Sequence, residues 1–599
     1  MSAARPDWRR THDCGELRSE NVGQLVTLNG WVSARRDHGG IYFVDLRDRY
    51  GLTQIVLGPE QADAAKLGPE FTISVRGKVV ARSAANVNAE RPTGEIEVIV
   101  EHLEILSRSK TPPFPIDDDD ETAIETRLRY RYLDLRRSRM QRNLVHRAKF
   151  IHAMRNAFER QGFVEVETPI LTRATPEGAR DFLVPSRVHP GEFYALPQSP
   201  QLFKQILMVA GLDRYFQVAR CFRDEDLRAD RQLEFTQLDM EMSFVEEDDV
   251  FLAWERVLKD TFRDALGTEI ATPFPRMPWK EAMERFGVDK PDMRFGLELV
   301  GVDEWARSSE FNVFRGAVEK GGRVMGLVVP AKHELTRKDI TALEESAKSN
   351  GAKGLAWWKA SAQGGSGPLS KFCAGDRGSG LMQRMNAAEG DLCLFVADRQ
   401  GVVWRVLGDL RNQLGKRFRL ADPAERRFLW VTEFPLFEFD EVEKRWFSSH
   451  HPFTAPVDWE MGGPDADPSK LASRAYDLVM DGWELGSGSV RIHRSDVQKR
   501  VFSILGIGPE EQQKKFGFLL EALSYGAPPH AGFAVGLDRL TALTLSLDNI
   551  RDVIAFPKTT SAADLMCEAP STVSPEQLEE VHIRSVVPAP ASPPALQGS

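Results

Sequence analysis

An arginine and a glutamate two residues apart stand between two apolar runs of the chain. Arg223 and Glu225 follow the run 215–219 and precede the run 235–242. This pattern predicts two antiparallel strands joined by a long polar loop, with both side chains on the same face of a strand. An arginine in such a place can bind a phosphate through two parallel hydrogen bonds. Taken alone, the stretch is more typical of an exposed, solvated charged hairpin, because charged loops are common.

Two further segments give this stretch a context. Residues 147–169 show a long helix pattern followed by a strand that ends in proline, and residues 532–540 read GFAVGLDRL, a glycine-rich strand leading into a helix. In their order and spacing the three segments resemble the signature motifs of class II aminoacyl-tRNA synthetases. The resemblance implies an α+β multidomain protein whose core is an antiparallel β-sheet flanked by helices.

The bulk composition is that of a soluble globular protein with several domains. The chain has 599 residues, of which 42% are hydrophobic, and no apolar run approaches the roughly 20 residues of a membrane span. Five scattered cysteines and the lack of an apolar N-terminal segment predict reduced thiols and a cytoplasmic location.

The net charge of −10 argues mildly against a nucleic-acid partner, but the charge is unevenly distributed. Residues 127–149 contain nine basic residues and a single acid, Asp134. Such a stripe can neutralise phosphates locally, and it is also compatible with a solvated or inter-subunit face.

Patterns along the chain predict six segments. Five candidate strands (25–34, 41–46, 53–57, 72–81 and 96–106) with a helical candidate at 59–67 favour an OB-fold β-barrel in residues 1–110. A proline-containing hinge (111–140) and the first part of the catalytic core (141–290) follow. We expect an α/β insertion domain at 291–425, the second part of the core at 426–585 and a disordered tail at 586–599.

An OB-fold ahead of the core is the arrangement of the synthetases for aspartate, asparagine and lysine. From about residue 13 to 585 the chain resembles the bacterial type of aspartyl-tRNA synthetase, in the segments 175–181 (TPEGARD), 198–204 (QSPQLFK), 450–453 (HHPF) and 481–491 (DGWELGSGSVR). The resemblance implies an aspartate site made of Glu177, Gln198, Gln201, Lys204, Arg223, His450 and Arg491.

Lys204 and Arg491 are the residue types that an aspartate side chain needs. Two cations can hold its carboxylate, whereas an asparagine amide would present its NH2 group to another donor. The resemblance therefore favours a ligase for aspartate over the asparaginyl and lysyl alternatives. Without the resemblance, Lys204 would be read as a lysine on a helix surface.

The family resemblance also assigns the nucleotide and metal contacts. Arg223, Glu225 and Arg539 are the expected catalytic residues, and Phe235 is expected to stack on adenine. The expected ATP contacts are Arg223, Asp224, Glu225, Gln232, Phe235, Glu484, Gly536, Leu537, Asp538 and Arg539. Asp477 and Glu484, seven residues apart, would share a helix face or converge across a helix–strand junction to hold Mg²⁺. The alternative is a pair of surface acids. Gly488, Gly532 and Gly536 are expected to let the backbone approach the nucleotide.

In the OB-fold, the resemblance implies that the tRNA anticodon is read by Arg36, Phe43, Gln54 and Glu97, with Phe43 stacked on a base. Phe43 could equally be a barrel core residue. His38 and Ala85 resemble the non-discriminating bacterial enzymes, which charge aspartate onto both tRNA(Asp) and tRNA(Asn). Neutral loop variation is the alternative at these two positions.

Two further expectations concern assembly and activity. The resemblance implies a homodimer, with Phe150, Met154, Ala157 and Phe158 forming an apolar helix face against the twin. An RNA-binding regulator that keeps the fold without the synthetic activity would require broken motifs. The residues Arg223, Glu225, Asp477, Glu484 and Arg539 are all present.

Overall fold

The computed structural model describes residues 8–174, 179–227, 231–463 and 466–586. Glu177 and the predicted tail beyond residue 586 lie outside the described residues. The described chain divides into two compact units. One contains residues 1–148 and 549–572, and the other contains most of the remainder. The domain limits given above remain predictions.

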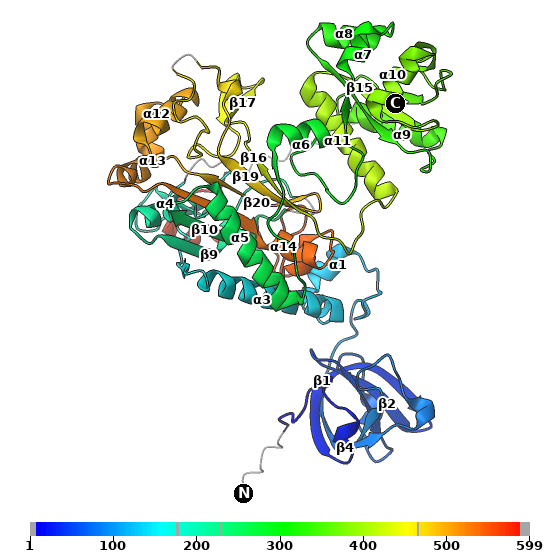
Figure 1. The fold of residues 1–599 in the computed structure, drawn as a ribbon. Coiled ribbons are helices and arrows are strands. Elements are labelled where there is room, and N and C mark those ends of the chain that lie inside the picture. The colour runs from blue at the N-terminus through cyan, green and yellow to red at the C-terminus, as the bar shows by residue number, and fades with distance from the viewer. Residues whose placement is uncertain (1–7, 175–178, 228–230, 464–465, 587–599) are drawn as a thin grey trace, which may run out of the picture. The chain divides into compact units, whose positions relative to one another are not determined.

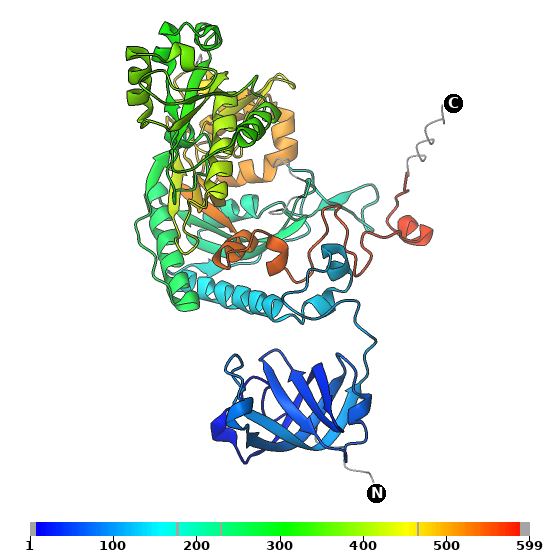
Figure 2. The same cartoon turned by 90° about the vertical axis from the view of Figure 1, so that its right-hand side faces the viewer.

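The first unit begins with a closed five-stranded barrel, visible in Figure 2. Its strands are β1 (Leu25–His38), β2 (Ile41–Arg47), β3 (Leu52–Leu57), β4 (Thr72–Ala81) and β5 (Ile96–Ser107), in the spatial order β1-β2-β3-β5-β4. Alternate side chains such as Val26, Leu28 and Val75 fill its interior. The predicted OB-fold is confirmed. The helical candidate at 59–67 is reduced to a single 3₁₀ turn, η2 (Ala64–Lys66).

Part of the basic stripe is internal. Helices α1 (Ile124–Arg129) and α2 (Arg131–Asp134) precede α3 (Ser138–Glu159). The carboxylate of Asp134 is fully buried and pairs with the guanidinium groups of Arg127 at 2.8 Å, Arg131 at 2.5 Å and Arg137 at 3.2 Å. Three of the nine basic residues therefore compensate one buried acid, so they do not belong to a continuous phosphate-binding face.

The second unit is built on an eight-stranded sheet. Its order is β11-β16-β19-β20-β21-β10-β9-β6, antiparallel except for the parallel pairs at the two edges. The strands are β6 (Val164–Glu165), β9 (Arg214–Phe222), β10 (Glu234–Ser243), β11 (Arg276–Pro278), β16 (Phe428–Thr432), β19 (Ala475–Met480), β20 (Trp483–Val490) and β21 (His530–Gly536). Strands β9 and β10 of the second motif thus lie beside β21 of the third, which confirms the predicted sheet.

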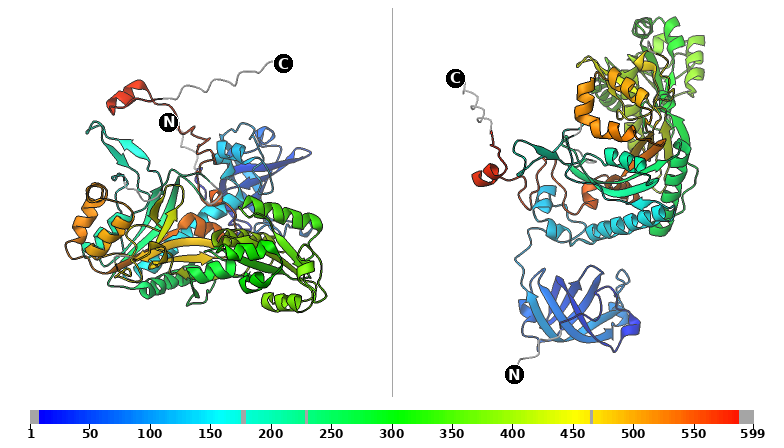
Figure 3. Two further views of the ribbon diagram at one scale, coloured as in Figure 1. Left: turned by 90° about the horizontal axis from the view of Figure 1, so that it is seen from above. Right: turned by 90° about the vertical axis from the view of Figure 1, so that its left-hand side faces the viewer.

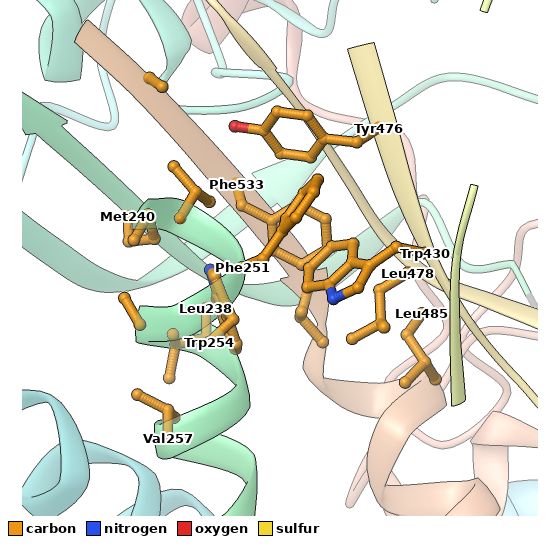
Figure 4. Packing of buried hydrophobic residues seen from close by; sticks show 14 of the residues in the cluster. Leu238, Met240, Phe251, Trp254, Val257, Trp430, Tyr476, Leu478, Leu485 and Phe533 are labelled. Atoms are coloured by element: carbon orange, nitrogen blue, oxygen red, sulfur yellow. The ribbon is translucent and has the colours of Figure 1, made fainter. Parts of the chain in front are cut away.

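Helix α5 (Glu247–Thr261) lies across one face of this sheet (Figure 1). Its side chains Phe251 and Trp254 pack against Trp430, Tyr476 and Phe533 from three strands (Figure 4). The rings of Phe251 and Trp430 stack at 4.4 Å between centroids. These large buried aromatic side chains fix the position of the strands that carry the candidate site.

The expected dimer face of α3 is part of this same core. Phe150, Met154, Ala157 and Phe158 are fully buried within the chain. Phe158 stacks on Phe216 at 4.9 Å and meets Trp254 edge to face. The prediction that these four residues contact a twin is therefore wrong, because the apolar face of α3 packs against its own α5 and β9.

Residues 300–417 form a second α/β layer. Strands β12 (Val300–Gly301), β13 (Arg323–Val329), β15 (Leu392–Asp398) and β14 (Ala356–Lys359) make a four-stranded antiparallel sheet in that order. The helices around it, seen from two further sides in Figure 3, are α7 (Asp303–Ser308), α8 (Asn312–Glu319), α9 (Arg337–Ser349), α10 (Asp376–Met385) and α11 (Gln400–Arg417). This agrees with the expected α/β insertion.

The second unit contains several further short elements. They are the hairpin β7 (Leu183–Pro185) and β8 (Phe193–Ala195), the pair β17 (Phe437–Asp440) and β18 (Arg445–Ser448), and the helices α4 (Gln201–Val209), α6 (Trp279–Phe286), α12 (Ser495–Ile504), α13 (Pro509–Leu523), α14 (Leu537–Thr544) and α15 (Pro575–Glu580). Among the described residues no helix is both long and apolar enough to cross a membrane. All five cysteines are free thiols.

Candidate active site and anticodon-binding surface

Arg223 and Glu225 lie beyond the end of a strand. Strand β9 ends at Phe222, and after it the Asp224 amide donates to the Arg180 carbonyl at 3.1 Å. The Arg223 amide still donates to the Leu233 carbonyl at 2.8 Å, but at Asp224 the chain pairs with the segment around Arg180 instead. The expectation that Arg223 and Glu225 share a strand face is therefore wrong. The Arg223 guanidinium lies 5.1 Å from the ring centre of Phe235, and Glu225 pairs with Arg231 at 2.8 Å.

Four charged side chains meet in the buried interior next to these residues. Lys204 on α4 donates to Asp239 at 2.6 Å and lies 3.2 Å from Glu241. Arg491, just after β20, donates hydrogen bonds to both carboxylate oxygens of Glu241 at 2.9 and 3.0 Å. Each of the four side chains is at most 2% exposed. Two cations and two anions thus balance, and both cations are held without solvent competition.

Burial shapes the protonation of the two acids differently. Desolvation raises the pKa of Asp239 to about 6, against the opposing attraction of Lys204. Desolvation acts on Glu241 in the same direction, but the nearby Arg491 and Lys204 bring the pKa of this carboxyl below its ordinary value. Glu241 is therefore the carboxylate of the cluster that stays ionised at neutral pH. Asp239 is the acid that titrates near pH 6, within the pH range of many assays.

The two adjacent histidines have separate partners. His450 contacts the Ser487 hydroxyl through Nδ1 at 3.0 Å, and burial lowers its pKa to about 4. His451 Nε2 lies 2.6 Å from Nη1 of Arg491. Because arginine only donates, Nε2 of His451 must accept and carry no proton. Burial and the neighbouring Arg491 place the pKa of His451 well below its ordinary value, in agreement with this neutral state.

The predicted glutamines lie at the start of α4 and just before it. Gln198 is buried, and its amide donates to the Ala179 carbonyl at 2.8 Å and to Asp181 at 2.6 Å. Gln201 is buried as well, and its Nε2 has no hydrogen-bond partner among the residues that the structure describes. A buried amide donor of this kind suits a polar ligand that completes its hydrogen bonding.

Asp477 and Glu484 lie on neighbouring antiparallel strands, β19 and β20, so the predicted helix face or helix–strand junction is wrong. Strand pairing brings Glu484 opposite Val479, at a bulge after Leu478. Asp477 is 7% exposed, and its Oδ1 has no hydrogen-bond partner in the described chain. Burial, with Glu484 close by, raises its pKa well above the ordinary value.

These two carboxylates fit Mg²⁺. The described residues contain no cluster of three or more His, Cys, Asp or Glu side chains suited to a metal. Magnesium needs no such cluster, because it is commonly held by one or two carboxylates together with substrate phosphates and water. The buried, unpartnered oxygen of Asp477 is the kind of hard ligand that this ion prefers.

Four of the residues expected to contact ATP, Gly536 to Arg539, lie at the start of α14. Asp538 accepts from the Thr236 amide at 2.8 Å, which ties α14 to β10. Arg539 donates to the Glu484 carbonyl at 2.5 Å. Gln232 is buried and donates to the Arg231 carbonyl at 3.2 Å. Leu537 is buried at the first helical position, and Gly536 precedes it.

The three glycines differ in what surrounds them. At Gly532 a Cβ atom would lie 1.7 Å from Oε2 of Glu241, and at Gly488 it would lie 2.3 Å from the Gly532 carbonyl oxygen. These two positions lack room for a side chain because of the chain's own packing, against Glu241 at Gly532 and against the neighbouring strands at Gly488. At Gly536 the nearest atom would be 3.8 Å away, so a ligand could approach there.

On the barrel, three of the four residues expected to read the anticodon share a hydrogen-bond network. Arg36 donates to Asp45 at 3.3 Å and to Gln54 at 3.4 Å, and Gln54 donates to Glu97 at 2.9 Å. Phe43 is half-buried and does not belong to the barrel core. His38, at the end of β1, and Ala85, in η3 (Ala84–Asn86), are both exposed.

Some residues of the charged cluster were not predicted from the sequence. They are Asp239, Glu241, His451 and Ser489, which hold Lys204 and Arg491. The signal for two of them was present, since Asp239 and Glu241 alternate with the apolar Leu238, Met240 and Met242 in the second half of β10. Such acids can lie on a buried face only if cations compensate them.

Comparisons with known proteins agree with this arrangement. The family model of tRNA synthetases class II (D, K and N) matches residues 123–560, and that of the OB-fold nucleic acid binding domain matches residues 26–106. A crystal structure of asparaginyl-tRNA synthetase from Pyrococcus horikoshii with asparaginyl-adenylate superposes with a TM-score of 0.57. At 20% identity, covering 92% of this chain and 98% of that one, it shows the shared fold.

Relatives of much higher identity span almost the whole chain. The Aspartate--tRNA(Asp/Asn) ligase of Caldanaerobacter subterraneus subsp. tengcongensis is 52% identical over 581 residues, which cover 96% of this chain and 98% of that protein. The protein of the same name from Moorella thermoacetica is 53% identical over 580 residues, 96% of this chain and 97% of that protein. The chain therefore belongs to the class II tRNA synthetases of the D, K and N group, in the family of the Aspartate--tRNA(Asp/Asn) ligases.

Proposed function

We propose that the protein attaches L-aspartate to tRNA(Asp) and to tRNA(Asn), in two steps through aspartyl-adenylate. The choice of aspartate as substrate rests on Lys204 and Arg491, two buried cations that contact the same acid, Glu241. An aspartate side chain can share this arrangement, whereas an asparagine amide would place its NH2 group against donors. The names of the relatives support the choice of aspartate and of both tRNAs.

In the first step the α-carboxylate of aspartate attacks the α-phosphorus of ATP. A bond forms between the carboxylate oxygen and phosphorus, the bond to the bridging oxygen breaks, and pyrophosphate leaves. No protein nucleophile is required, so positioning and charge neutralisation are the contributions of the protein. Arg223 binds the α-phosphate and the carboxylate, and Arg539 binds the γ-phosphate. Glu225 contacts the adenine amino group, and Phe235 stacks on the adenine ring. Gln198, Gln201, His450 and Glu177 complete the contacts to aspartate.

In the second step a ribose hydroxyl at the 3′ end of the tRNA attacks the activated carbonyl, and AMP leaves. Asp477 and Glu484 would hold Mg²⁺, which neutralises phosphate charge when bound. Arg36, Phe43, Gln54 and Glu97 would read the anticodon. His38 and Ala85 would admit tRNA(Asn) as well as tRNA(Asp). A homodimer in the cytoplasm, with ATP, aspartate and tRNA as partners, completes the proposal.

An asparaginyl or strictly discriminating aspartyl enzyme is the competing function. ATP–pyrophosphate exchange with aspartate, asparagine and lysine tests the amino acid, and we expect exchange with aspartate alone. Charging of two purified transcripts, tRNA(Asp) and tRNA(Asn), tests the tRNA. Comparable aspartylation of both supports the proposal. Charging of tRNA(Asp) alone would overturn the second acceptor, and exchange with asparagine would overturn the amino acid.

A further inference from the structure

A lysine outside the three signature motifs lies beside the proposed metal pair. The ammonium of Lys290 is 4.0 Å from Oε2 of Glu484, and both side chains are partly exposed. The preceding residue, Asp289, is half-buried and acts electrostatically on both Asp477 and Glu484. The ammonium of Lys290 thus lies at one member of the proposed metal pair, and the charge of Asp289 acts on both members.

The backbone on either side of Lys290 is firmly held. Gly287, which ends α6, has φ of 70°, and a Cβ there would lie 2.4 Å from the Trp404 carbonyl oxygen in α11. The fully buried Arg411 of α11 donates to the carbonyls of Asp292 at 2.9 Å and Phe295 at 2.8 Å. Its guanidinium also lies 4.2 Å from the ring centre of Phe295. Segment 287–296 is therefore fixed to α11 at both ends.

The same segment is fixed to the turn between β19 and β20. Arg294 lies 3.6 Å from the carboxylate of Asp481, and a Cβ at Gly482 would lie 3.1 Å from the Cβ of Asp292. This turn directly precedes Glu484. The main chain of Lys290 is thus held in place relative to the proposed metal pair, and the flexible lysine side chain can extend its ammonium toward a bound triphosphate.

The Lys290–Glu484 pair is weak. At 4.0 Å, with side chains 51% and 38% exposed, it is the kind of ion pair that contributes about 0–1 kcal/mol. Little free energy therefore opposes the transfer of this ammonium from Glu484 to a stronger anion. A triphosphate placed between Arg223 and Arg539 is such an anion, and a lysine ammonium binds phosphate as a mobile point charge.

We propose that Lys290 is a further ATP-binding residue, whose ammonium leaves Glu484 for the triphosphate when the nucleotide binds. This inference rests on the proposed use of ATP, and it adds a contact from the segment that leads into the insertion domain. Lys290 binds the nucleotide without taking part in bond formation. Lys290 binds the triphosphate of ATP, and aspartate binding around Lys204 does not depend on Lys290.

Three variants test this role. Lys290→Met removes the charge and keeps the stem, Lys290→Arg keeps the charge, and Lys353→Met changes an exposed lysine of the insertion domain as a control. Binding of the non-hydrolysable analogue α,β-methylene-ATP with Mg²⁺ is measured by calorimetry, and KM values for ATP and aspartate by pyrophosphate exchange.

We expect Lys290→Met to weaken analogue binding about tenfold, the effect of one charge-assisted hydrogen bond, and to raise KM for ATP similarly. KM for aspartate stays unchanged. Lys290→Arg restores binding to within about threefold, and Lys353→Met behaves as wild type. Unchanged analogue binding in Lys290→Met would overturn the inference, as would a lower kcat with unchanged KM for ATP, which indicates a merely structural role. Failure of the wild-type protein to exchange with aspartate would instead count against the proposed function.

Discussion

The rings of His38 and Phe43 meet edge to face, with 5.4 Å between their centroids and perpendicular planes. Such a contact contributes about 0.5–1.5 kcal/mol and orients the phenylalanine ring. Phe43 is the residue proposed to stack on an anticodon base. His38 can therefore act on base reading through Phe43, in addition to any contact of its own.

The acceptance of tRNA(Asn) is accordingly expected to depend on this contact. His38→Leu combined with Ala85→Lys should lower charging of tRNA(Asn) at least about tenfold relative to tRNA(Asp), since each base mismatch costs about 1–3 kcal/mol. The measurement is aspartylation of both transcripts. Phe43→Ala serves as the comparison and should impair both tRNAs. An equal loss on the two transcripts with the double variant would contradict a role in discrimination.

The free energy of unfolding should depend on pH through the titration of Asp239. Its pKa of about 6 in the folded state exceeds the ordinary 3.8, so the folded protein keeps a proton that the unfolded chain has released. This contribution is fully present below about pH 4 and is lost as the pH rises through about 6. Between pH 5 and 7.5 the loss amounts to about 1.4 kcal/mol.

The variant Asp239→Asn lacks this titration. Its Tm relative to wild type should therefore rise by roughly 1–2 °C between pH 5 and pH 7.5 in thermal denaturation. Asp289 is no suitable control because its charge acts on the proposed metal pair, whereas the exposed Asp376→Asn should show no such trend. A Tm difference that stays constant with pH would show that Asp239 does not titrate in this range.

His451 is expected to orient Arg491 for aspartate. Removing the acceptor in His451→Leu leaves Nη1 of Arg491 with one buried partner fewer, and a hydrogen bond to a charged group contributes about 1.5–3 kcal/mol. KM for aspartate should therefore rise about tenfold or more, with KM for ATP unchanged. His451→Gln, which retains an acceptor, should recover part of the loss. A parallel rise in both KM values would indicate general disruption, which the exposed control His102→Leu should not cause.

Gly532 should tolerate no side chain because a Cβ atom would clash with Glu241, and not because the nucleotide approaches the backbone there. In Gly532→Ala the new Cβ would displace the Glu241 carboxylate that holds Arg491 and Lys204. We expect a lower Tm, equivalent to about 1–3 kcal/mol of overpacking, and a higher KM for aspartate. Gly316→Ala, in an open position of α8, is the matched control and should leave both values unchanged. A change confined to KM for ATP would refute this explanation.

Local patterns predicted the barrel well because parts of β1, β4 and β5 alternate buried and less buried side chains, and the observed ends differ from the predicted ones by a few residues. Features that depend on partners distant in sequence were predicted less well. Asp477 and Glu484 converge through strand pairing, not through helical spacing. Phe158 meets Phe216 and Trp254, a pairing that the apolar face of one helix cannot reveal.

The charged cluster shows the same limit. Lys204 and Arg491 were identified through the family resemblance, but the acids that hold them come from a third segment, β10. Only the fold shows that Asp239 and Glu241 are buried between these cations, and only the burial of His451 against Arg491 explains why that histidine is neutral.

The turn at Asp481 bears on how the insertion domain could be exchanged between proteins. Arg294, from the entering chain, and Arg426, from the leaving chain, both lie within 3.6 Å of its carboxylate, and the Arg427 amide donates to it at 2.9 Å. A chimaera joined through plain flexible linkers would leave this acid, 7% exposed, without its cations. A graft should therefore have its junctions outside residues 292–427, so that the donor domain brings both arginines that pair with Asp481 beside the proposed metal pair.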